Sequence, residues 1–281
     1  NLGPRPIDLH LKGFKALGAD IHYQDDNYII SADKLVGTKI YLDIASVGAT
    51  INIIMAAVYA QGETTIENAA REPEIIDCIT LLNEMGADIR GGGTSKITIN
   101  GVEKLSGCFH EIIPDRIEAG TYLILAAAMA KQVTIENVIP YHLESLISKL
   151  IEMGVEIDSQ IDKIVVRKSD NCLKKVDIKT MPYPGFATDL QAPLTALLTQ
   201  AMGNSSVTET IYKERFKHCQ QLNKMGANII ITPPSAIVVG PTSLSGTDVW
   251  ATDLRCGAAL VIAALMAKGT TTIHDIYHID R

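Results

Sequence analysis

The chain closes on the stretch VWATDLRCGAALVIAALMAKGTTTIHDIYHIDR, residues 249–281, whose order of residue types predicts its local fold. Asp253 and Arg255 open an apolar run over 258–267 that is long enough for a helix, and a glycine ends it. The β-branched residues 270–273 then predict a strand, and a polar loop follows. The stretch therefore predicts helix, turn, strand and charged loop in that order.

The same plan recurs three times upstream. Three further apolar runs are each followed by a short β-branched stretch: 48–60 then 64–68, 121–130 then 133–137, and 188–202 then 207–210. A second, amphipathic segment follows each of these strands, and a hairpin follows that segment, as at 89–100. One repeat therefore reads βαβαββ, and a repeat of this size is a structural unit.

Four glycines mark the period of the repeat. Gly18, Gly86, Gly154 and Gly226 end the amphipathic helices at intervals of 68 (86−18), 68 (154−86) and 72 (226−154) residues. A glycine after the last apolar turn suits a left-handed helix C-cap, and the strand that follows begins at once. The chain begins with the second half of one repeat and stops after the first half of another. We therefore expect roughly four repeats cut from a longer enzyme.

Composition excludes several classes of protein. The net charge is −7, which argues against a binder of nucleic acid or of a membrane surface, and the apolar runs are too short to span a bilayer. Seven histidines show no metal-ligand spacing, so we expect no metal site and no cofactor. Five cysteines form no CxxC pair, which predicts free thiols in a reducing cytoplasm, with Cys78, Cys219 and Cys256 packed in the interior.

Four arginines stand at loop or helix-start positions of the repeats: Arg5, Arg215, Arg255 and Arg281. Arginine binds carboxylates and phosphates with two hydrogen bonds, so the four would suit a small, highly charged anion if the fold brought them together. Four separate surface arginines are the alternative. Asp189 stands where a proline-rich loop meets a predicted helix, as a general base or simply as a cap stabilised by the helix dipole.

Two segments near the start of the chain carry weaker signals. Residues 1–10 contain two X-Pro steps that hold the backbone extended, so Arg5 and Asp8 either line a cleft or belong to a capped entry to a helix over 11–17. Residues 44–50 pass from a strand into a helix whose first amide groups suit a phosphate, although Ser46 could be an ordinary cap. The segment 112–118 predicts a proline-broken strand at a domain boundary, with Asp115 and Arg116 as hinge or cap.

These residues carry a resemblance. The motifs Arg5–His10, Ser46–Thr50, Glu67–Glu74, Pro114–Glu118, Ala187–Ala192, Ala251–Arg255 and Tyr277–Arg281 resemble those of the UDP-N-acetylglucosamine 1-carboxyvinyltransferases, the enolpyruvyl transferases of peptidoglycan synthesis. The resemblance covers essentially the whole chain, and seven motifs in order make it specific. It implies an α/β fold in which each of two domains is an inside-out α/β barrel of βαβαββ units.

The resemblance also implies the domains and the reaction. Residues 1–113 would be part of the domain that carries the catalytic loop, and 114–281 an incomplete second domain, with the active site in the cleft between them. The implied reaction moves the enolpyruvyl group of phosphoenolpyruvate to the 3′-hydroxyl of UDP-N-acetylglucosamine and releases phosphate through a tetrahedral intermediate. The implied partners are these two small molecules in the cytoplasm, and the oligomeric state is left open.

Site residues follow by similarity, position by position. Asp189 resembles the base near the sugar hydroxyl and Asp253 its supporting acid, both catalytic together with Arg255 and Arg281. The substrate-binding positions are these: Arg5, Arg215, Arg255 and Arg281 for phosphoenolpyruvate, Pro6, Ile7, Asp8 and Leu9 for uridine, Ser46, Val47 and Gly48 for the diphosphate, and Asp189 and Ile211 for the sugar.

The sequence departs from the family pattern in two places. Ile44 stands where some members have a lysine near the nucleotide, which removes one charge contact. The family's mobile loop, whose cysteine acts as general acid, would precede residue 1, and none of the five cysteines matches it. We therefore expect the chain alone to be inactive and its full-length parent to be active.

Two alternatives stand beside this interpretation. The related 3-phosphoshikimate 1-carboxyvinyltransferase has the same fold and donor, although the motifs at 5–10 and 46–50 fit the UDP-sugar enzyme better. A non-catalytic binding protein of the same fold is the other alternative, and the presence of every expected arginine and aspartate argues against it.

Overall fold

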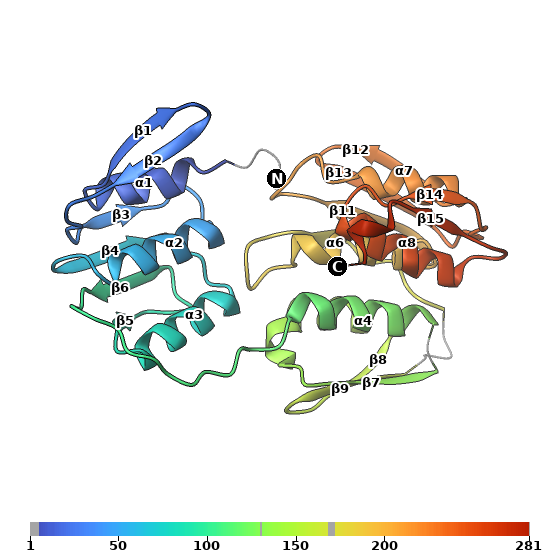
Figure 1. Ribbon diagram of the computed structural model, residues 1–281. Helices are drawn as coiled ribbons and strands as arrows, with labels where there is room; N and C mark the ends of the chain where they lie inside the picture. Colours follow the sequence, from blue (N-terminus) through green and yellow to red (C-terminus); the bar gives the residue numbers. More distant parts are fainter. Residues whose placement is uncertain (1–5, 130, 168–171, 281) are drawn as a thin grey trace. The chain divides into compact units, whose positions relative to one another are not determined.

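The computed structural model describes residues 6–129, 131–167 and 172–280 (Figure 1). The chain divides into two compact units, Asn1–Ile113 (unit 1) and Pro114–Arg281 (unit 2). The division falls at the position expected from the sequence, in front of Pro114. That the two units are the loop-bearing and the second domain of an enolpyruvyl transferase stays a prediction.

Unit 1 alternates helices with short strands. Its elements are α1 (Asp8–Ala16), β1 (Asp20–Gln24), β2 (Asn27–Ser31), β3 (Lys39–Tyr41), α2 (Val47–Ala57), β4 (Glu63–Glu67), α3 (Pro73–Glu84), β5 (Asp88–Arg90) and β6 (Lys96–Asn100). One sheet has the order β3-β4-β6-β5, in which β3 and β4 are parallel and the other pairs antiparallel. The strands β1 and β2 form a separate hairpin.

Unit 2 repeats this plan. Its elements are α4 (Arg116–Met129), β7 (Gln132–Glu136), η1 (Pro140–Leu143), α5 (Glu144–Glu152), β8 (Glu156–Ser159), β9 (Lys163–Arg167), β10 (Ile178–Lys179), η2 (Thr188–Leu190), α6 (Gln191–Leu198), β11 (Gly203–Thr208), α7 (Lys217–Lys224), β12 (Asn228–Thr232), β13 (Ser235–Gly240), β14 (Asp248–Trp250), α8 (Leu254–Met266), β15 (Thr272–His274) and η3 (Ile276–His278). Its sheets have the orders β7-β9-β8, β10-β11-β13-β12 and β14-β15.

The βαβαββ repeat is confirmed. In β3-β4-β6-β5 and again in β10-β11-β13-β12, two parallel strands joined over a helix are followed by a second helix and an antiparallel hairpin. The four period-marking glycines have φ between 94° and 106°, the left-handed conformation expected of a C-cap: Gly18, Gly86, Gly154 and Gly226. Among the described residues the sheets stay separate, and no closed barrel is present.

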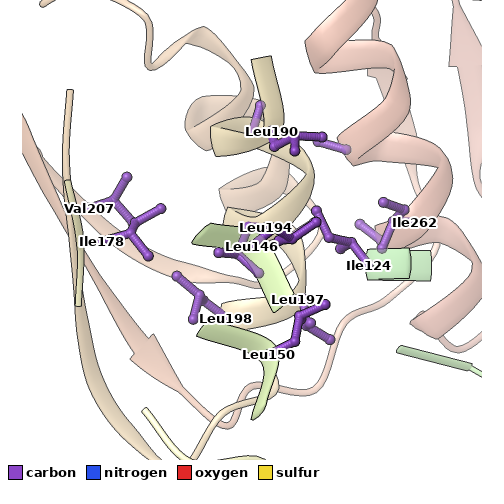
Figure 2. Close-up of a cluster of buried hydrophobic side chains, with 14 of the residues drawn as sticks. Ile124, Leu146, Leu150, Ile178, Leu190, Leu194, Leu197, Leu198, Val207 and Ile262 are labelled. Carbon is purple, nitrogen blue, oxygen red and sulfur yellow. The ribbon is translucent and has the colours of Figure 1, made fainter. Parts of the chain in front are cut away.

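The helix α6 is the centre of the unit 2 core. All eight of its residues are buried, and six of the eight are apolar. Figure 2 shows Leu194, Leu197 and Leu198 among side chains of α4 and α5 such as Ile124 and Leu150. This packing holds the start of α6, and therefore the residues just before it, in a fixed place.

Two local expectations were wrong. Helix α1 begins at Asp8 rather than at 11, because Pro6 restricts only the residue before it and an acidic side chain in the first turn favours the helix dipole. The segment 112–118 contains no strand. Asp115 Oδ1 accepts hydrogen bonds from the amides of Ile117 at 2.8 Å and Glu118 at 3.1 Å, so it caps α4, which confirms one of the two roles expected for it.

A histidine near the end of unit 1 contacts two carboxylates of α3. His110 Nε2 lies 2.9 Å from Asp77 Oδ1, and Nδ1 lies 3.1 Å from Glu84 Oε2. Four residues earlier, the Ser106 amide donates to the carbonyl of Met85 at 2.8 Å. The hydrogen bond to Asp77 raises the pKa of His110 above 6.5, burial opposes it, and Glu84 adds to the rise.

This contact predicts a pH-dependent stability. Because the pKa of His110 is higher in the folded state, its stabilisation is complete below pH 6.5 and is lost as pH rises through the folded-state value. Urea midpoints of the wild type and His110→Gln, measured between pH 5 and 9, should differ most at the acidic end. A difference that stays constant with pH would show that the ring contributes only by packing.

No helix in the described part of the chain is long and apolar enough to cross a bilayer.

Candidate active site

Asp189 lies in η2, immediately before the buried helix α6. Its carboxylate does not cap that helix, so the simple cap is the wrong alternative. Instead, Oδ1 accepts hydrogen bonds from two guanidinium groups, from Nε of Arg255 and from Nη1 of Arg215 at 3.3 Å. One carboxylate oxygen therefore joins two arginines that lie 40 residues apart (255−215) in the sequence.

Asp253 has the capping role that Asp189 lacks. It is the N-cap of α8, and its Oδ1 accepts from the amides of Arg255 at 2.9 Å and Cys256 at 3.1 Å. This satisfies amides that a helix start leaves unpaired, and it places Arg255 in the first turn of α8. Because α8 packs against α6, the Arg255 side chain reaches Asp189.

Arg215 follows β11 in the loop before α7 and has contacts on several sides. Nη1 donates to the hydroxyl of Thr188 at 2.8 Å, and the guanidinium carbon lies 3.9 Å from the centre of the Tyr212 ring. Burial lowers the pKa of Arg215, and the charge of Arg255 lowers it further, whereas the charges of Asp189 and Glu209 raise it. Arginine stays protonated in proteins, so the site holds two cations.

A cavity of about 420 Å³ opens beside these residues. We call it the arginine cavity, and its lining includes Lys213, Arg215, Lys217, His218, Asp253 and Arg255. His218 is almost fully buried, and that burial lowers its pKa to about 4, so the imidazole is neutral at pH 7. The lining carries four cations and the two carboxylates of Glu214 and Asp253, so cations are in excess, which suits a small anion.

Other site residues expected in unit 2 lie near the arginine cavity or outside the described residues. Ile211 is exposed on the loop that leads to Arg215, and its amide donates to Glu209 Oε1 at 2.9 Å. The alternative of separate surface arginines is wrong for Arg215 and Arg255, which share Asp189. Arg281 and Arg5 lie outside the described residues, so their roles stay predictions.

In unit 1 the structure brings two expected segments together at the starts of α1 and α2. A Cβ on Gly48 would lie 3.2 Å from Cε1 of His10, and His10 Nδ1 is 2.8 Å from Asn52 Nδ2. Ser46 caps α2 by accepting from the Ala49 amide at 3.3 Å, as the sequence suggests. The first turn of α2 thus lies close to α1, and the amide groups that begin a helix suit a phosphate.

The side chains of these two segments differ in their exposure to solvent. Pro6, Asp8 and Gly48 are exposed, Ile7 and Val47 are half-buried, and Leu9 belongs to the core. Any ligand contact of Leu9 is therefore made by its backbone. Ile44 is 66% exposed just before α2, and its apolar side chain brings no charge to this end of the helix.

The thiols divide by burial, and this predicts their reactivity. Cys219 and Cys256 are buried as expected, whereas Cys78 is only half-buried and Cys108 and Cys172 are exposed. Burial raises the pKa of Cys219 to about 12. At pH 8 iodoacetamide should alkylate Cys108 and Cys172 quickly and leave Cys219 unmodified until the protein is denatured. Mass spectrometry of timed samples checks this, and early labelling of Cys219 would contradict it.

Three residues around Arg215 were missed in the sequence: Thr188, Glu209 and Tyr212. Glu209 is the most informative, because it is fully buried and accepts four hydrogen bonds. Its only sequence signal is a glutamate at the end of the β-branched stretch 207–210, a position that usually faces solvent. Thr188 lies inside the motif 187–192 and Tyr212 lies outside the motifs, but no pattern singles out either residue.

Comparisons with known proteins give the family of the chain. Residues 1–281 match the family described as EPSP synthase (3-phosphoshikimate 1-carboxyvinyltransferase). The chain is 60% identical over 280 residues to UDP-N-acetylglucosamine 1-carboxyvinyltransferase 2 of Listeria innocua serovar 6a, and 58% identical over 281 residues to the protein of that name in Bacillus subtilis strain 168. Each alignment covers 100% of this chain but only 66% of the relative.

Solved structures show the same fold. The enolpyruvyl transferase NikO from Streptomyces tendae superposes with a TM-score of 0.90 at 27% identity, over 100% of this chain and 69% of that one. An EPSP synthase from Acinetobacter baumannii superposes with a TM-score of 0.72 at 23% identity, over 96% of this chain and 66% of that one, which speaks for the fold alone. The chain has the enolpyruvyl transferase fold and belongs to the EPSP synthase (3-phosphoshikimate 1-carboxyvinyltransferase) family.

Proposed function

We propose that the protein containing this chain transfers the enolpyruvyl group of phosphoenolpyruvate to the 3′-hydroxyl of UDP-N-acetylglucosamine and releases phosphate, a step of peptidoglycan synthesis. The observation that carries the proposal is the joining of Arg215 and Arg255 by Asp189 beside the arginine cavity. Relatives at about 60% identity bear the name of this activity, which supports the choice of acceptor. The cytoplasmic location expected from the sequence stays a prediction.

The proposed chemistry uses the charges in the arginine cavity. The two guanidinium groups neutralise the carboxylate and phosphate of phosphoenolpyruvate. When the sugar oxygen bonds to C2, its proton passes to Asp189 and C3 takes up a proton, which gives a tetrahedral intermediate. Loss of phosphate from C2 and of a proton from C3 then restores the double bond. The resemblance assigns the proton at C3 to a cysteine that none of the five here matches.

Asp253 has two roles in this proposal, one chemical and one structural. It is the supporting acid by resemblance, and in the structure it caps α8 and holds Arg255 in the first helical turn. The proposed roles of Pro6, Ile7, Asp8 and Leu9 with uridine, and of Ser46, Val47 and Gly48 with the diphosphate, rest on the resemblance. The close approach of α1 and α2 supports them.

The second candidate is transfer to shikimate 3-phosphate, which the description of the matching family favours. The full-length protein should therefore be offered phosphoenolpyruvate with either UDP-N-acetylglucosamine or shikimate 3-phosphate, and the released phosphate measured. We expect release only with the UDP-sugar. Release only with shikimate 3-phosphate would overturn the proposed acceptor, and release with neither would favour a binding protein.

A further inference from the structure

Glu209 is a buried carboxylate that the proposed chemistry does not use. It follows the end of β11, and its side chain is completely shielded from solvent. Removing a carboxylate from water is costly unless hydrogen bonds replace the water. Because Glu209 is buried close to Arg215, the groups that offset the cost of burying its carboxylate also bear on the site.

The hydrogen bonds to Glu209 divide between its two oxygens. Oε1 accepts from the Thr180 hydroxyl at 2.8 Å and from the amides of Ile211 at 2.9 Å and Tyr212 at 3.0 Å. Oε2 accepts from the Thr188 hydroxyl at 2.8 Å. The two carboxylate oxygens have enough lone pairs to accept from all four donors. The four donors therefore replace the water that burial removes from Glu209.

The bond to Thr188 sets the direction of a hydroxyl. Thr188 has one hydroxyl proton, and the structure directs it to Oε2 of Glu209. A lone pair of the same oxygen is then free to accept from Nη1 of Arg215, which lies 2.8 Å away. Glu209 thus acts on Arg215 through one intervening side chain.

The bonds to Oε1 act on Arg215 through Tyr212. They fix the amides of Ile211 and Tyr212, and the Tyr212 ring lies against the guanidinium of Arg215 at 3.9 Å. The charge of Glu209 also favours the protonated arginine, which opposes the effect of burial and of Arg255 on the pKa of Arg215. Glu209 therefore holds two of the groups that contact this guanidinium, Thr188 and Tyr212, while Asp189 contacts it independently.

We propose that Glu209 is a positioning residue that fixes the guanidinium of Arg215 for the substrate anion, through Thr188 and through the turn at 211–212, without touching substrate itself. The part that concerns phosphoenolpyruvate rests on the proposed function, whereas the orientation of Arg215 does not. The effect through Thr188 can be tested separately from the effect through the turn at 211–212. Oε2 accepts from Thr188, whereas Oε1 accepts from the amides of that turn.

The experiment uses the full-length protein with Glu209→Gln, Thr188→Val, Thr188→Ser and the double variant Glu209→Gln/Thr188→Val. Valine keeps the shape of threonine but cannot donate or accept, whereas serine keeps the hydroxyl. Glu156→Gln, on the exposed face of β8, is the matched control for loss of a carboxylate. Thermal unfolding identifies any variant that fails to fold, and Thr188→Val keeps the test decisive if Glu209→Gln does fail.

We expect the KM for phosphoenolpyruvate to rise about 10- to 100-fold in Glu209→Gln and in Thr188→Val, as for loss of one charge-assisted hydrogen bond. The KM for the UDP-sugar should stay the same, and Thr188→Ser and Glu156→Gln should resemble the wild type. The double variant should be no worse than the more impaired of its two parents. An unchanged KM for phosphoenolpyruvate in Thr188→Val, or additive effects, would overturn the proposal.

A second measurement is independent of turnover. In ¹⁵N-arginine-labelled protein without ligand, the guanidinium signals of Arg215, assigned by Arg215→Lys, should exchange with water at least about tenfold faster in Glu209→Gln and in Thr188→Val. Equal exchange in all forms would overturn the positioning role even if the enzyme turns over. Faster exchange in a protein that releases no phosphate would uphold the role of Glu209 and reject the proposed function alone.

Discussion

Asp189→Asn is expected to lower the rate of phosphate release by about 10²- to 10⁴-fold in the full-length protein, the usual contribution of a general base. Asparagine keeps the size of the side chain but cannot take the proton of the attacking hydroxyl. It also leaves Arg215 and Arg255 without the anion that joins them. Because the two guanidinium groups stay positive, the KM for phosphoenolpyruvate should not rise, and the loss should appear in kcat.

The control for this change is Asp158→Asn, which alters an exposed carboxylate on β8 in the same unit. It should leave both kinetic constants unchanged. If Asp189→Asn also keeps kcat within tenfold of the wild type, Asp189 is not the base, and its role is limited to pairing with the arginines. Steady-state phosphate release at saturating UDP-N-acetylglucosamine distinguishes these outcomes.

Gly101→Ala is expected to give the largest loss of stability, more than about 4 kcal/mol. A Cβ at this position would lie 1.6 Å from the carbonyl oxygen of Ala60 and 2.8 Å from its carbon, and a backbone carbonyl cannot rotate away as a side chain can. The Gly101 amide also donates to the carbonyl of Gly62 at 3.0 Å. The added methyl group must therefore push β6 and the end of α2 apart.

The matched control is Gly107→Ala, six residues later in the same segment. A Cβ there would meet no atom within 4 Å, so the free energy of unfolding should change by less than about 0.5 kcal/mol. Urea unfolding of both variants measures the difference. Equal stability of the two would mean that the turn at Gly101 relaxes without cost to the sheet.

Much of the fold could be predicted because the same pattern of apolar, glycine and β-branched residues recurs in each repeat. The glycines at 86, 154 and 226 each end an apolar helical face, and a helix that must stop there leaves a strand as the next element. Where the repeat gave no support, the prediction failed. The segment 112–118 is rich in β-branched and charged residues, yet it contains no strand, and only the expected cap at Asp115 is confirmed.

The candidate site could be predicted only in part, because similar motifs acquire different roles in three dimensions. Asp189 and Asp253 both follow a threonine and precede a leucine, but Asp253 caps a helix whereas Asp189 pairs with two arginines. The difference arises from α8, which brings Arg255 to Asp189 from 66 residues away (255−189). Glu209 could not be found, since nothing local shows that its carboxylate will be buried.

The separate sheets also bear on how the protein is made. In the described part of the chain every ladder closes within one continuous segment, such as 39–100 for β3 to β6 and 178–240 for β10 to β13. Contacts between residues close in sequence form with little loop-closure entropy, and chains begin to fold from the end synthesised first. We expect each sheet to assemble soon after its own residues leave the ribosome, so that few unpaired strand edges are exposed to other nascent chains.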